Sequence, residues 1–328
     1  MNLLLLGGPK FVGRAVIDAA LARGHEMTLF NRGTTAADLY PELERIVGDR
    51  DGGLDGLLGR EWDAVVDTSG YVPRIVGGSA NLLAAAVGHY VFVSSISVYA
   101  SFAEVVTEES PLETLSEPGS EEVRDHYGAL KALCEREVES AFPGRSTLVR
   151  AGLIVGPHDP TGRFTYWPHR IARGGDVLVP GPARRQVQFV DVRDLAEWMV
   201  TAAETGLPGP FNATGPSTMG AVVDAARRVS GATARAVEVD DAFLAARGVG
   251  EWMELPLWID GGNEETRYFH EVDTSRATAA GLTFRSLDDT VAATLAEAEL
   301  VDGVGLALER ERELLEAWWS RGGSSVDG

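Results

Sequence analysis

The stretch LLLLGGPKFVGRAV, residues 3–16, decides the fold that we expect for this chain. Its four leucines make an apolar run of strand length, and the residues that follow repeat apolar positions at helical spacing. Gly7, Gly8 and Gly13 lie where the strand gives way to the helix. Glycines there let the backbone approach a pyrophosphate, and the helix N-terminus adds N–H groups and a positive dipole. The stretch therefore predicts the first strand, turn and helix of a dinucleotide-binding βαβ unit.

Apolar runs alternate with helical segments through the first two-thirds of the 328 residues. We expect strands at 2–6, 27–30, 63–68, 90–95 and 147–152. Helices are expected at 11–24 and 79–88, each ending at a glycine that can cap it. Strands without polar alternation are typical of a parallel sheet that is covered on both faces. The pattern predicts an α/β fold with a doubly wound, Rossmann-like parallel sheet.

The C-terminal part of the chain is less regular and contains aromatic and Gly/Pro-rich stretches. Helices are expected at 192–206, 219–231 and 307–320, and disorder is expected in the tail 322–328. This region predicts a smaller C-terminal substrate lobe beside the Rossmann-like domain. We assign 1–156 to the dinucleotide-binding domain, with 188–214 returning to it, and 157–187 and 215–328 to the lobe.

Composition excludes several classes of partner. A net charge of −20 and a pI near 4.7 repel phosphate backbones and anionic lipids, so we expect neither nucleic acid nor a membrane as partner. The apolar run in MNLLLLGG is too short for a signal peptide and lacks a basic segment before it. With Cys134 as the single cysteine, a cytoplasmic protein is expected. No His, Cys or Asp cluster has metal-ligand spacing, so no metal is expected.

The second strand ends in TLFNRG, residues 28–33, where an acidic side chain would bind the ribose 2′-hydroxyl of NAD. This chain has Asn31 and Arg32 instead, with Lys10 in the glycine turn. Two cations and no carboxylate suit a 2′-phosphate, so NADP(H) is favoured and NAD(H) is the alternative. For Lys10, an exposed loop cation is the alternative. Asp49 is a candidate acceptor for the adenine amino group, with an ordinary loop aspartate as the alternative.

Further cofactor contacts are expected where the third predicted strand ends in DTSG. Thr68, Ser69 and Gly70 follow directly from that strand. Because carboxyl ends of parallel strands meet at one edge of the sheet, these residues should face the dinucleotide together with the glycine turn.

The stretch DHYGALKALCERE, residues 125–137, holds the candidate catalytic pair. Tyr127 and Lys131 are four positions apart and share a helix face. An ammonium and an oxidised nicotinamide stabilise a phenolate and lower its pKa, which lets tyrosine exchange a proton with a substrate oxygen. Lys131 is one of only two lysines, and a planar guanidinium would not reproduce its compact charge. Ser95 ends the strand 90–95 and is expected to hold the same oxygen; a purely structural hydroxyl is the alternative.

Taken together, the motifs resemble those of the extended short-chain dehydrogenase/reductase superfamily, which includes NAD-dependent epimerases and dehydratases. The resemblance covers about residues 1–230 and is carried by GGPKFVG, DTSG, VSSISVY, YGALK, RAGLIVGP and QFVDVRDLA. It implies a Ser95, Tyr127 and Lys131 catalytic triad and a homodimer. It also implies cofactor contacts at Gly7, Phe11, Val12, Asn31, Arg32, Asp49, Thr68 and Ser69.

Departures from the superfamily pattern concern the substrate. Leu153 and Val187 stand where nucleotide-sugar enzymes commonly carry an asparagine and an arginine for the substrate diphosphate. Arg184 and Arg185 could compensate, or could be exposed loop cations. Ile75 stands where a helix asparagine often relays a proton. Candidate substrate contacts come from the irregular region: His158, Arg163, Tyr166, Trp167, Arg170, Trp252 and Trp258.

The sequence favours an NADP(H)-dependent oxidoreductase that acts on a small or medium carbonyl or alcohol substrate. Two alternatives remain open. One is a nucleotide-sugar epimerase or dehydratase with tightly bound NAD. The other is a dinucleotide-sensing protein without chemistry.

Overall fold

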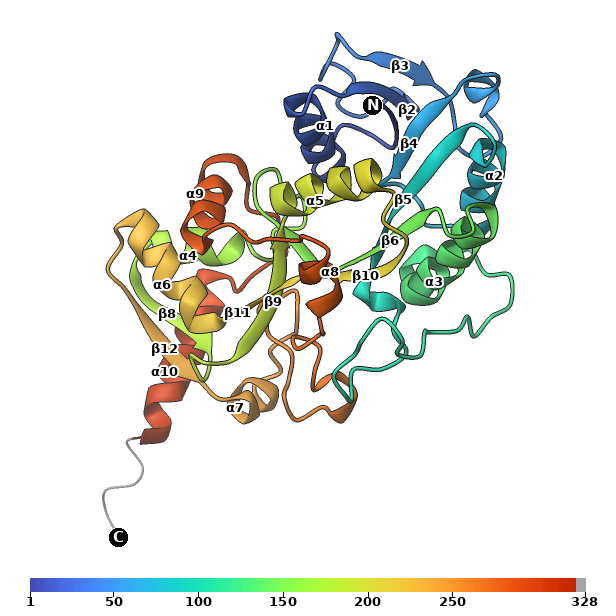
Figure 1. Cartoon of the computed structure of the whole chain (residues 1–328). Helices are drawn as coiled ribbons and strands as arrows, with labels where there is room; N and C mark the ends of the chain where they lie inside the picture. The colour runs from blue at the N-terminus through green and yellow to red at the C-terminus, as the bar shows by residue number, and fades with distance from the viewer. Residues whose placement is uncertain (323–328) are drawn as a thin grey trace.

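The computed structural model describes residues 1–322 and contains a seven-stranded parallel sheet in the order β10-β6-β5-β4-β1-β2-β3 (Figure 1). Every neighbouring pair in this sheet is parallel. The α/β, Rossmann-like prediction is thereby confirmed. The strands are β1 (Asn2–Leu6), β2 (Glu26–Asn31), β3 (Glu44–Val47), β4 (Trp62–Asp67), β5 (Val87–Ser95), β6 (Ser146–Ala151) and β10 (Gly209–Ala213).

Helices cover both faces of this sheet. On one face lie α1 (Val12–Ala22) and α5 (Val192–Thr205), and on the other α2 (Pro73–Leu83) and α3 (Val123–Ala141) (Figure 1). In β1, Leu3 and Leu5 pack into the core with α1 and α5, whereas Leu4 and Leu6 pack into the core with α2 and α3. The run of four leucines is therefore explained by burial on both sides of the strand.

The second helix and the strand that follows it differ from the expectation. The second helix spans Pro73–Leu83 rather than 79–88, because Pro73 is suited to the first turn of a helix. Gly88 is no helix cap but lies inside β5, where a Cβ would come 2.6 Å from the carbonyl oxygen of Asp63. The outer strands β3 and β10 were not among the five expected strands. Gly24 does follow the end of α1 with a φ of +76°, as expected for a C-terminal glycine.

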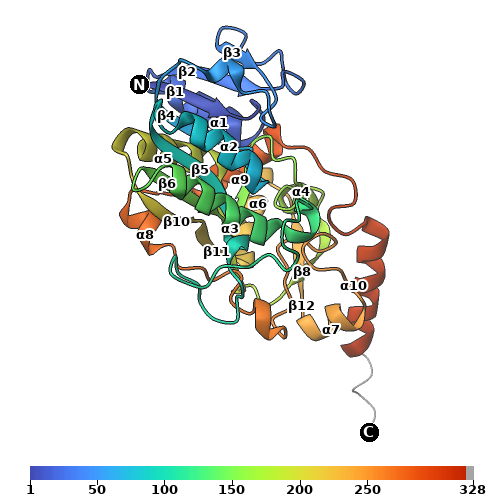
Figure 2. The ribbon, with the colours of Figure 1, turned by 90° about the vertical axis from the view of Figure 1, so that its right-hand side faces the viewer.

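The C-terminal lobe is built around two small sheets, one of which includes residues 153–155 and 188–191 that the expected boundaries gave to the dinucleotide-binding domain (Figures 1 and 2). They are formed by β7 (Leu153–Val155), β9 (Gln186–Asp191) and β11 (Gly215–Thr218), and by β8 (Gly175–Pro180) and β12 (Ala234–Val239). Its helices are α4 (Tyr166–Ala172), α6 (Met219–Ser230), α7 (Asp241–Ala246), α8 (Ser275–Ala279), α9 (Leu287–Glu297) and α10 (Leu308–Gly322). Short 3₁₀ turns lie at Asp55–Leu57, Ile96–Val98 and Glu264–Thr266. Disorder was expected in the tail 322–328; Gly322 instead ends α10, and residues 323–328 lie outside the described residues.

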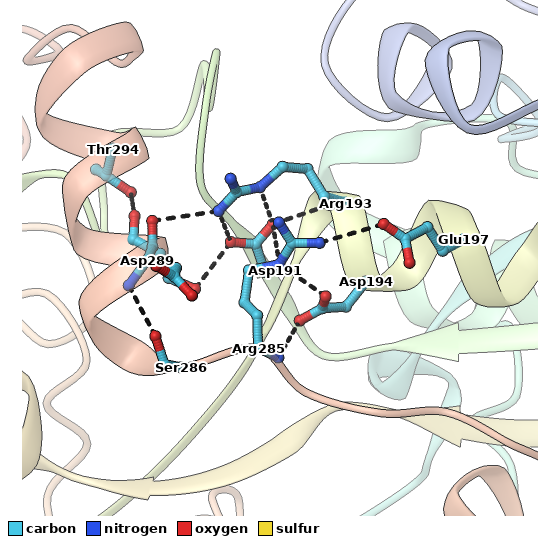
Figure 3. Close-up of polar contacts among 9 residues, drawn as sticks. Asp191, Arg193, Asp194, Glu197, Arg285, Ser286, Asp289 and Thr294 are labelled. Atoms are coloured by element: carbon cyan, nitrogen blue, oxygen red, sulfur yellow. Dashed lines mark hydrogen bonds and ion pairs between the residues drawn. The ribbon is translucent and has the colours of Figure 1, made fainter. Parts of the chain in front are cut away.

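A polar network centred on Asp191 joins the lobe to the large sheet (Figure 3). Asp191 ends β9 and caps α5, accepting from the Arg193 N–H at 2.9 Å and from the Arg193 guanidinium at 2.9 and 2.7 Å. From α9, the Thr290 hydroxyl donates to the second oxygen of Asp191 at 2.8 Å. Arg285, which precedes α9, donates to Asp194 on α5 at 2.7 Å. The start of α5 is therefore held against the C-terminal lobe.

We predict that Asp191→Ala lowers the free energy of unfolding by about 3 kcal/mol, because it removes a helix cap and leaves a partly buried arginine without its carboxylate. Urea denaturation of the purified protein measures this change. The control is Asp288→Ala, which breaks an exposed ion pair with Arg228 and should change stability much less. Equal losses in the two variants would contradict a special role for Asp191.

Candidate active site

Two adjoining cavities lie at the carboxyl edge of the large sheet, where β2 and β4 flank β1 on opposite sides. The larger has a volume of about 630 Å³ and is bounded by the end of β5, α3, β7 and the C-terminal lobe. The smaller has a volume of about 360 Å³ and is bounded by the glycine turn and the ends of β2 and β3. Tyr71 lines both cavities. Together they follow the edge where doubly wound sheets bind dinucleotides.

The three predicted catalytic side chains all line the larger cavity. Ser95 comes from the end of β5, and Tyr127 and Lys131 come from α3. The Ser95 oxygen accepts from the Ser97 N–H at 3.1 Å and pairs with the Ser97 hydroxyl at the same distance. Tyr127 is 36% exposed and lies next to Tyr71, with ring centroids 6.5 Å apart. The cavity therefore brings a phenol, a serine hydroxyl and an ammonium into one space.

Lys131 is 2% exposed and donates to two backbone carbonyls, Gly70 O at 2.7 Å and Val93 O at 2.6 Å. Its ammonium also lies 4.1 Å from the centroid of the Phe92 ring. Burial lowers the pKa of Lys131 to about 8. An ammonium has three N–H donors, so one donor remains for a ligand in the cavity.

The main influences on the pKa of Tyr127 in this structure come from groups other than Lys131. Burial is the dominant influence and raises the pKa of Tyr127. The opposing influences come from the Ser95 hydroxyl and from the Arg163 guanidinium across the cavity. The Lys131 ammonium donates to the carbonyls of Gly70 and Val93, so its charge lies against the backbone and beside any ligand that binds in the cavity.

The glycine turn lines the smaller cavity and fits a dinucleotide. Gly7 has a φ of +137°, and a Cβ there would come 2.3 Å from Thr68 Oγ1. A Cβ on Gly13 would come 2.2 Å from the carbonyl oxygen of Gly8, whereas Gly8 itself faces open space. The first and last glycines therefore allow close packing of turn, helix and sheet, and Gly8 leaves room for a ligand beside the N-terminus of α1.

The other predicted cofactor residues divide between the two cavities. Phe11, Val12 and Thr68 line the larger one, and Asn31, Arg32, Asp49 and Ser69 line the smaller one. Gly70 contributes its carbonyl to Lys131. The Lys10 side chain is exposed and lines neither cavity.

Asn31 supports the glycine turn. Its amide nitrogen donates to Gly7 O at 3.2 Å, and its amide oxygen accepts from the Gly33 N–H at 2.9 Å. These bonds hold the end of β2 against the turn after β1. Arg32 is the exposed cation at the rim of the smaller cavity.

A buried ion pair under the smaller cavity was missed by the sequence reasoning. Arg50 donates to both oxygens of Asp67, at 2.7 and 2.6 Å, and to Ser79 Oγ at 2.9 Å. Asp67 also accepts from the Tyr90 hydroxyl at 2.8 Å and from the Ser69 N–H at 3.0 Å. The network fixes the turn after β4. The signal in the sequence was Asp67, which ends an apolar strand. A buried carboxylate requires a partner, so this aspartate indicated an ion pair.

Of the candidate substrate contacts, only Arg163 and Trp252 line the larger cavity. Trp167 and Trp258 are fully buried in the core of the lobe, as is most of Tyr166. The others have different partners: His158 pairs with Glu297 at 3.0 Å, and Arg170 pairs with Glu311 at 2.6 Å. Cavity residues that the sequence reasoning did not single out are Tyr71, Pro160, Thr161, Ile259 and Phe269.

Neither diphosphate contact typical of nucleotide-sugar enzymes has a substitute in the larger cavity. Leu153 lines that cavity, whereas Val187 is fully buried in β9. Arg185 donates to Asp241 and to the carbonyl of Ile259, and exposed Arg184 does not line the cavity. Ile75 contributes an apolar side chain to the smaller cavity.

Comparison with models of protein families tests the family resemblance that the sequence motifs predicted. The model of the NAD dependent epimerase/dehydratase family matches residues 3–213. The chain belongs to the NAD-dependent epimerase/dehydratase family. The resemblance to the extended short-chain dehydrogenase/reductases is thereby confirmed.

Among curated proteins, a 3-beta-hydroxysteroid dehydrogenase of Mycolicibacterium neoaurum is 28% identical over 233 residues, 63% of this chain and 62% of that protein. The chloroplast stem-loop binding protein of 41 kDa b of Arabidopsis thaliana is 25% identical over 214 residues, 60% of this chain and 53% of that protein. The matched region is less than two thirds of either relative's length.

Among solved structures, UDP-glucuronic acid 4-epimerase of Bacillus cereus in complex with NAD shares the fold. It has a TM-score of 0.64 and 16% identity, covering 89% of this chain and 94% of that one. At this identity the likeness establishes the fold and not the substrate.

Two general features of residues 1–322 bear on the class of site. Within that range, no helix has the length and apolar character needed to cross a membrane. The same residues contain no group of three or more His, Cys, Asp and Glu side chains placed to hold a metal ion.

Proposed function

We propose that the protein is an NADP(H)-dependent reductase of a small or medium carbonyl compound. The observation that carries this proposal is the larger cavity, because Ser95, Tyr127 and Lys131 line it together at the carboxyl edge of the sheet. The glycine turn and the smaller cavity beside it support binding of the dinucleotide.

In this proposal the bound nicotinamide supplies the hydride that reduces the carbonyl carbon. Tyr127 gives its phenolic proton to the carbonyl oxygen, and the Ser95 hydroxyl donates a second hydrogen bond to that oxygen. Lys131 offers its remaining N–H to the dinucleotide. Burial raises the pKa of Tyr127.

The cavity argues against a nucleotide-sugar substrate. Lys131 and Arg163 are its only cationic lining residues, and Lys131 is bonded to backbone carbonyls. A diphosphate would require more cationic partners than one guanidinium. The net charge of −20 likewise argues against carrying over the stem-loop binding of the chloroplast relative. A sensor without chemistry would not need the Tyr127 phenol.

The preference for NADP(H) over NAD(H) rests on the end of β2. Asn31 binds backbone groups, and no carboxylate occupies the position that would accept from a ribose 2′-hydroxyl. Arg32 lines the smaller cavity and is exposed, so its guanidinium is available for a 2′-phosphate. Asp49, which lines this cavity together with Asp51, is proposed to accept from the adenine amino group.

The assembly and location are also part of the proposal. We propose a cytoplasmic homodimer that forms through α2 and α3, the two helices that lie together on one face of the sheet (Figure 1). In this homodimer each chain supplies all three residues of its own site, Ser95, Tyr127 and Lys131.

We predict that Tyr127→Phe lowers kcat with NADPH and a carbonyl substrate by roughly 100- to 10,000-fold, because it removes the proton donor. Affinity for NADPH, measured by fluorescence titration, should change little. Turnover is followed at the absorbance band of the reduced nicotinamide in a screen of carbonyl compounds. Tyr268→Phe, which removes a phenol that does not line either cavity, is the matched control and should keep full activity. Undiminished turnover in Tyr127→Phe would refute the proposed chemistry.

A second prediction concerns the choice of cofactor. Arg32→Ala should weaken NADPH binding on the order of 10-fold, because it removes the cation proposed for the 2′-phosphate. NADH binding should stay within about 2-fold, since NADH has no such phosphate. Equal effects on the two dinucleotides, or tighter binding of NADH by the unaltered protein, would contradict the NADP(H) preference.

A further inference from the structure

Arg163 is an unpaired cation in the wall of the larger cavity. Its guanidinium lies 4.9 Å from the ring centroid of Trp252. It forms no hydrogen bond or ion pair with any residue between 1 and 322. The fully buried arginines behave differently: Arg150 pairs with Glu135 at 2.7 Å, and Arg170 pairs with Glu311 at 2.6 Å. Arg163 is partly buried and has no such ion pair, so its charge is available to an anion that enters the cavity.

Two more polar groups lie on the same loop as Arg163. The Thr161 hydroxyl is buried, lines the cavity and lies beside the Asp159 carboxylate, whose pKa it lowers. Asp159, 3% exposed, accepts from the Thr161 N–H at 2.8 Å with one oxygen, and its other oxygen has no partner. Buried polar groups are normally hydrogen-bonded. The loop between β7 and α4 therefore contributes a hydroxyl and a cation to the wall of the cavity.

Among the described residues, the wall of this cavity carries hydroxyl and apolar side chains but no acidic one. Its apolar members include Leu153, Ile154, Trp252, Ile259 and Phe269. Burial lowers the pKa of Arg163, opposed by the nearby charge of Asp159, and the ordinary value is so high that the guanidinium stays charged. An anion that enters this space meets a positive charge, aromatic faces and no competing carboxylate in the lining.

We infer that the substrate carries a carboxylate, bound by Arg163 and Thr161, on an apolar or aromatic body that packs against Trp252. The inference rests on the proposed function, because it assigns the part of the substrate that lies away from Tyr127. A single guanidinium matches the two oxygens of one carboxylate in a bidentate pair. A substrate with a phosphate or diphosphate would require more charge than this loop supplies.

Arg163 lines the same cavity as Tyr127, so one substrate can contact both side chains. The guanidinium is close enough to Tyr127 to lower the pKa of the phenol, so both face the same space. A rigid molecule with a carbonyl at one end and a carboxylate at the other can then contact both. Arg163 would select the substrate by its charge, and Tyr127 would act on its carbonyl.

The test uses 4-formylbenzoate, its methyl ester and 4-formylphenyl phosphate as probes. Binding to the full chain saturated with NADP⁺ is measured by titration calorimetry, because the oxidised cofactor cannot reduce the aldehyde. The variants are Arg163→Met, which keeps an apolar contact with Trp252, and Arg163→Lys, which keeps a charge. Arg136→Met, an exposed arginine on α3 outside both cavities, is the matched control. Circular dichroism and melting temperature establish that each variant folds.

We expect the unaltered protein to bind 4-formylbenzoate better than its ester, and Arg163→Met to weaken the acid on the order of 100-fold with the ester unchanged. Arg163→Lys should recover part of this loss, and Arg136→Met should have no effect. Equal weakening of acid and ester, unchanged affinity for the acid, or tighter binding of the phosphate probe than of the carboxylate would overturn the inference.

Turnover with NADPH separates this inference from the proposed function. If the protein binds the acid selectively but reduces no aldehyde, the inference stands and the proposed chemistry fails. If it reduces the ester as well as the acid, and Arg163→Met leaves the two rates unchanged, the chemistry stands and the inference fails.

Discussion

The buried ammonium of Lys131 is the interaction on which the geometry of the candidate site depends. It donates to Gly70 O and Val93 O, and so connects α3 to the turn after β4 and to the end of β5. A buried ammonium without acceptors would be strongly destabilising, so α3 cannot shift without losing both bonds. Tyr127 is one turn away on the same helix, and Ser95 ends the same strand as Val93. A planar guanidinium would not fit between the two carbonyls, which accounts for a lysine in this arginine-rich chain.

Two further polar networks hold the walls of the cavity around this point. One turn beyond Lys131, Glu135 pairs with Arg150 on β6 at 2.7 Å and accepts from the Ser94 hydroxyl at 2.6 Å. The Asp191 network binds the C-terminal lobe to the start of α5. The sheet side of the cavity therefore supplies the groups for chemistry, and the lobe supplies the wall that faces the substrate. A shared fold with a separate substrate wall is how related enzymes come to act on different compounds.

Most strands of the central sheet could be predicted from the sequence because each contains a local run of apolar residues. The leucine run of β1 is buried on both faces, and the glycines lie where close packing excludes a Cβ. Non-local contacts could not be predicted in the same way. The pairing of Arg50 with Asp67 and the use of Asn31 to brace the glycine turn depend on distant parts of the chain. The start of α2 was misplaced because its alanine-rich end looked more helical than the segment after Pro73.

The candidate active site shows the same contrast between local patterns, which could be predicted, and non-local contacts, which could not. Tyr127 and Lys131 could be paired from their spacing, whereas the aromatic candidates of the lobe could not be sorted, since a core tryptophan and a cavity tryptophan look alike in sequence. Trp258 is core and Trp252 lines the cavity.

The most direct test of the proposed site is a crystal structure of the protein with NADP⁺. The account predicts the nicotinamide end of the dinucleotide among Ser95, Tyr127 and Lys131, with its adenosine end at Arg32. A dinucleotide bound elsewhere, or with its nicotinamide remote from Tyr127, would contradict it.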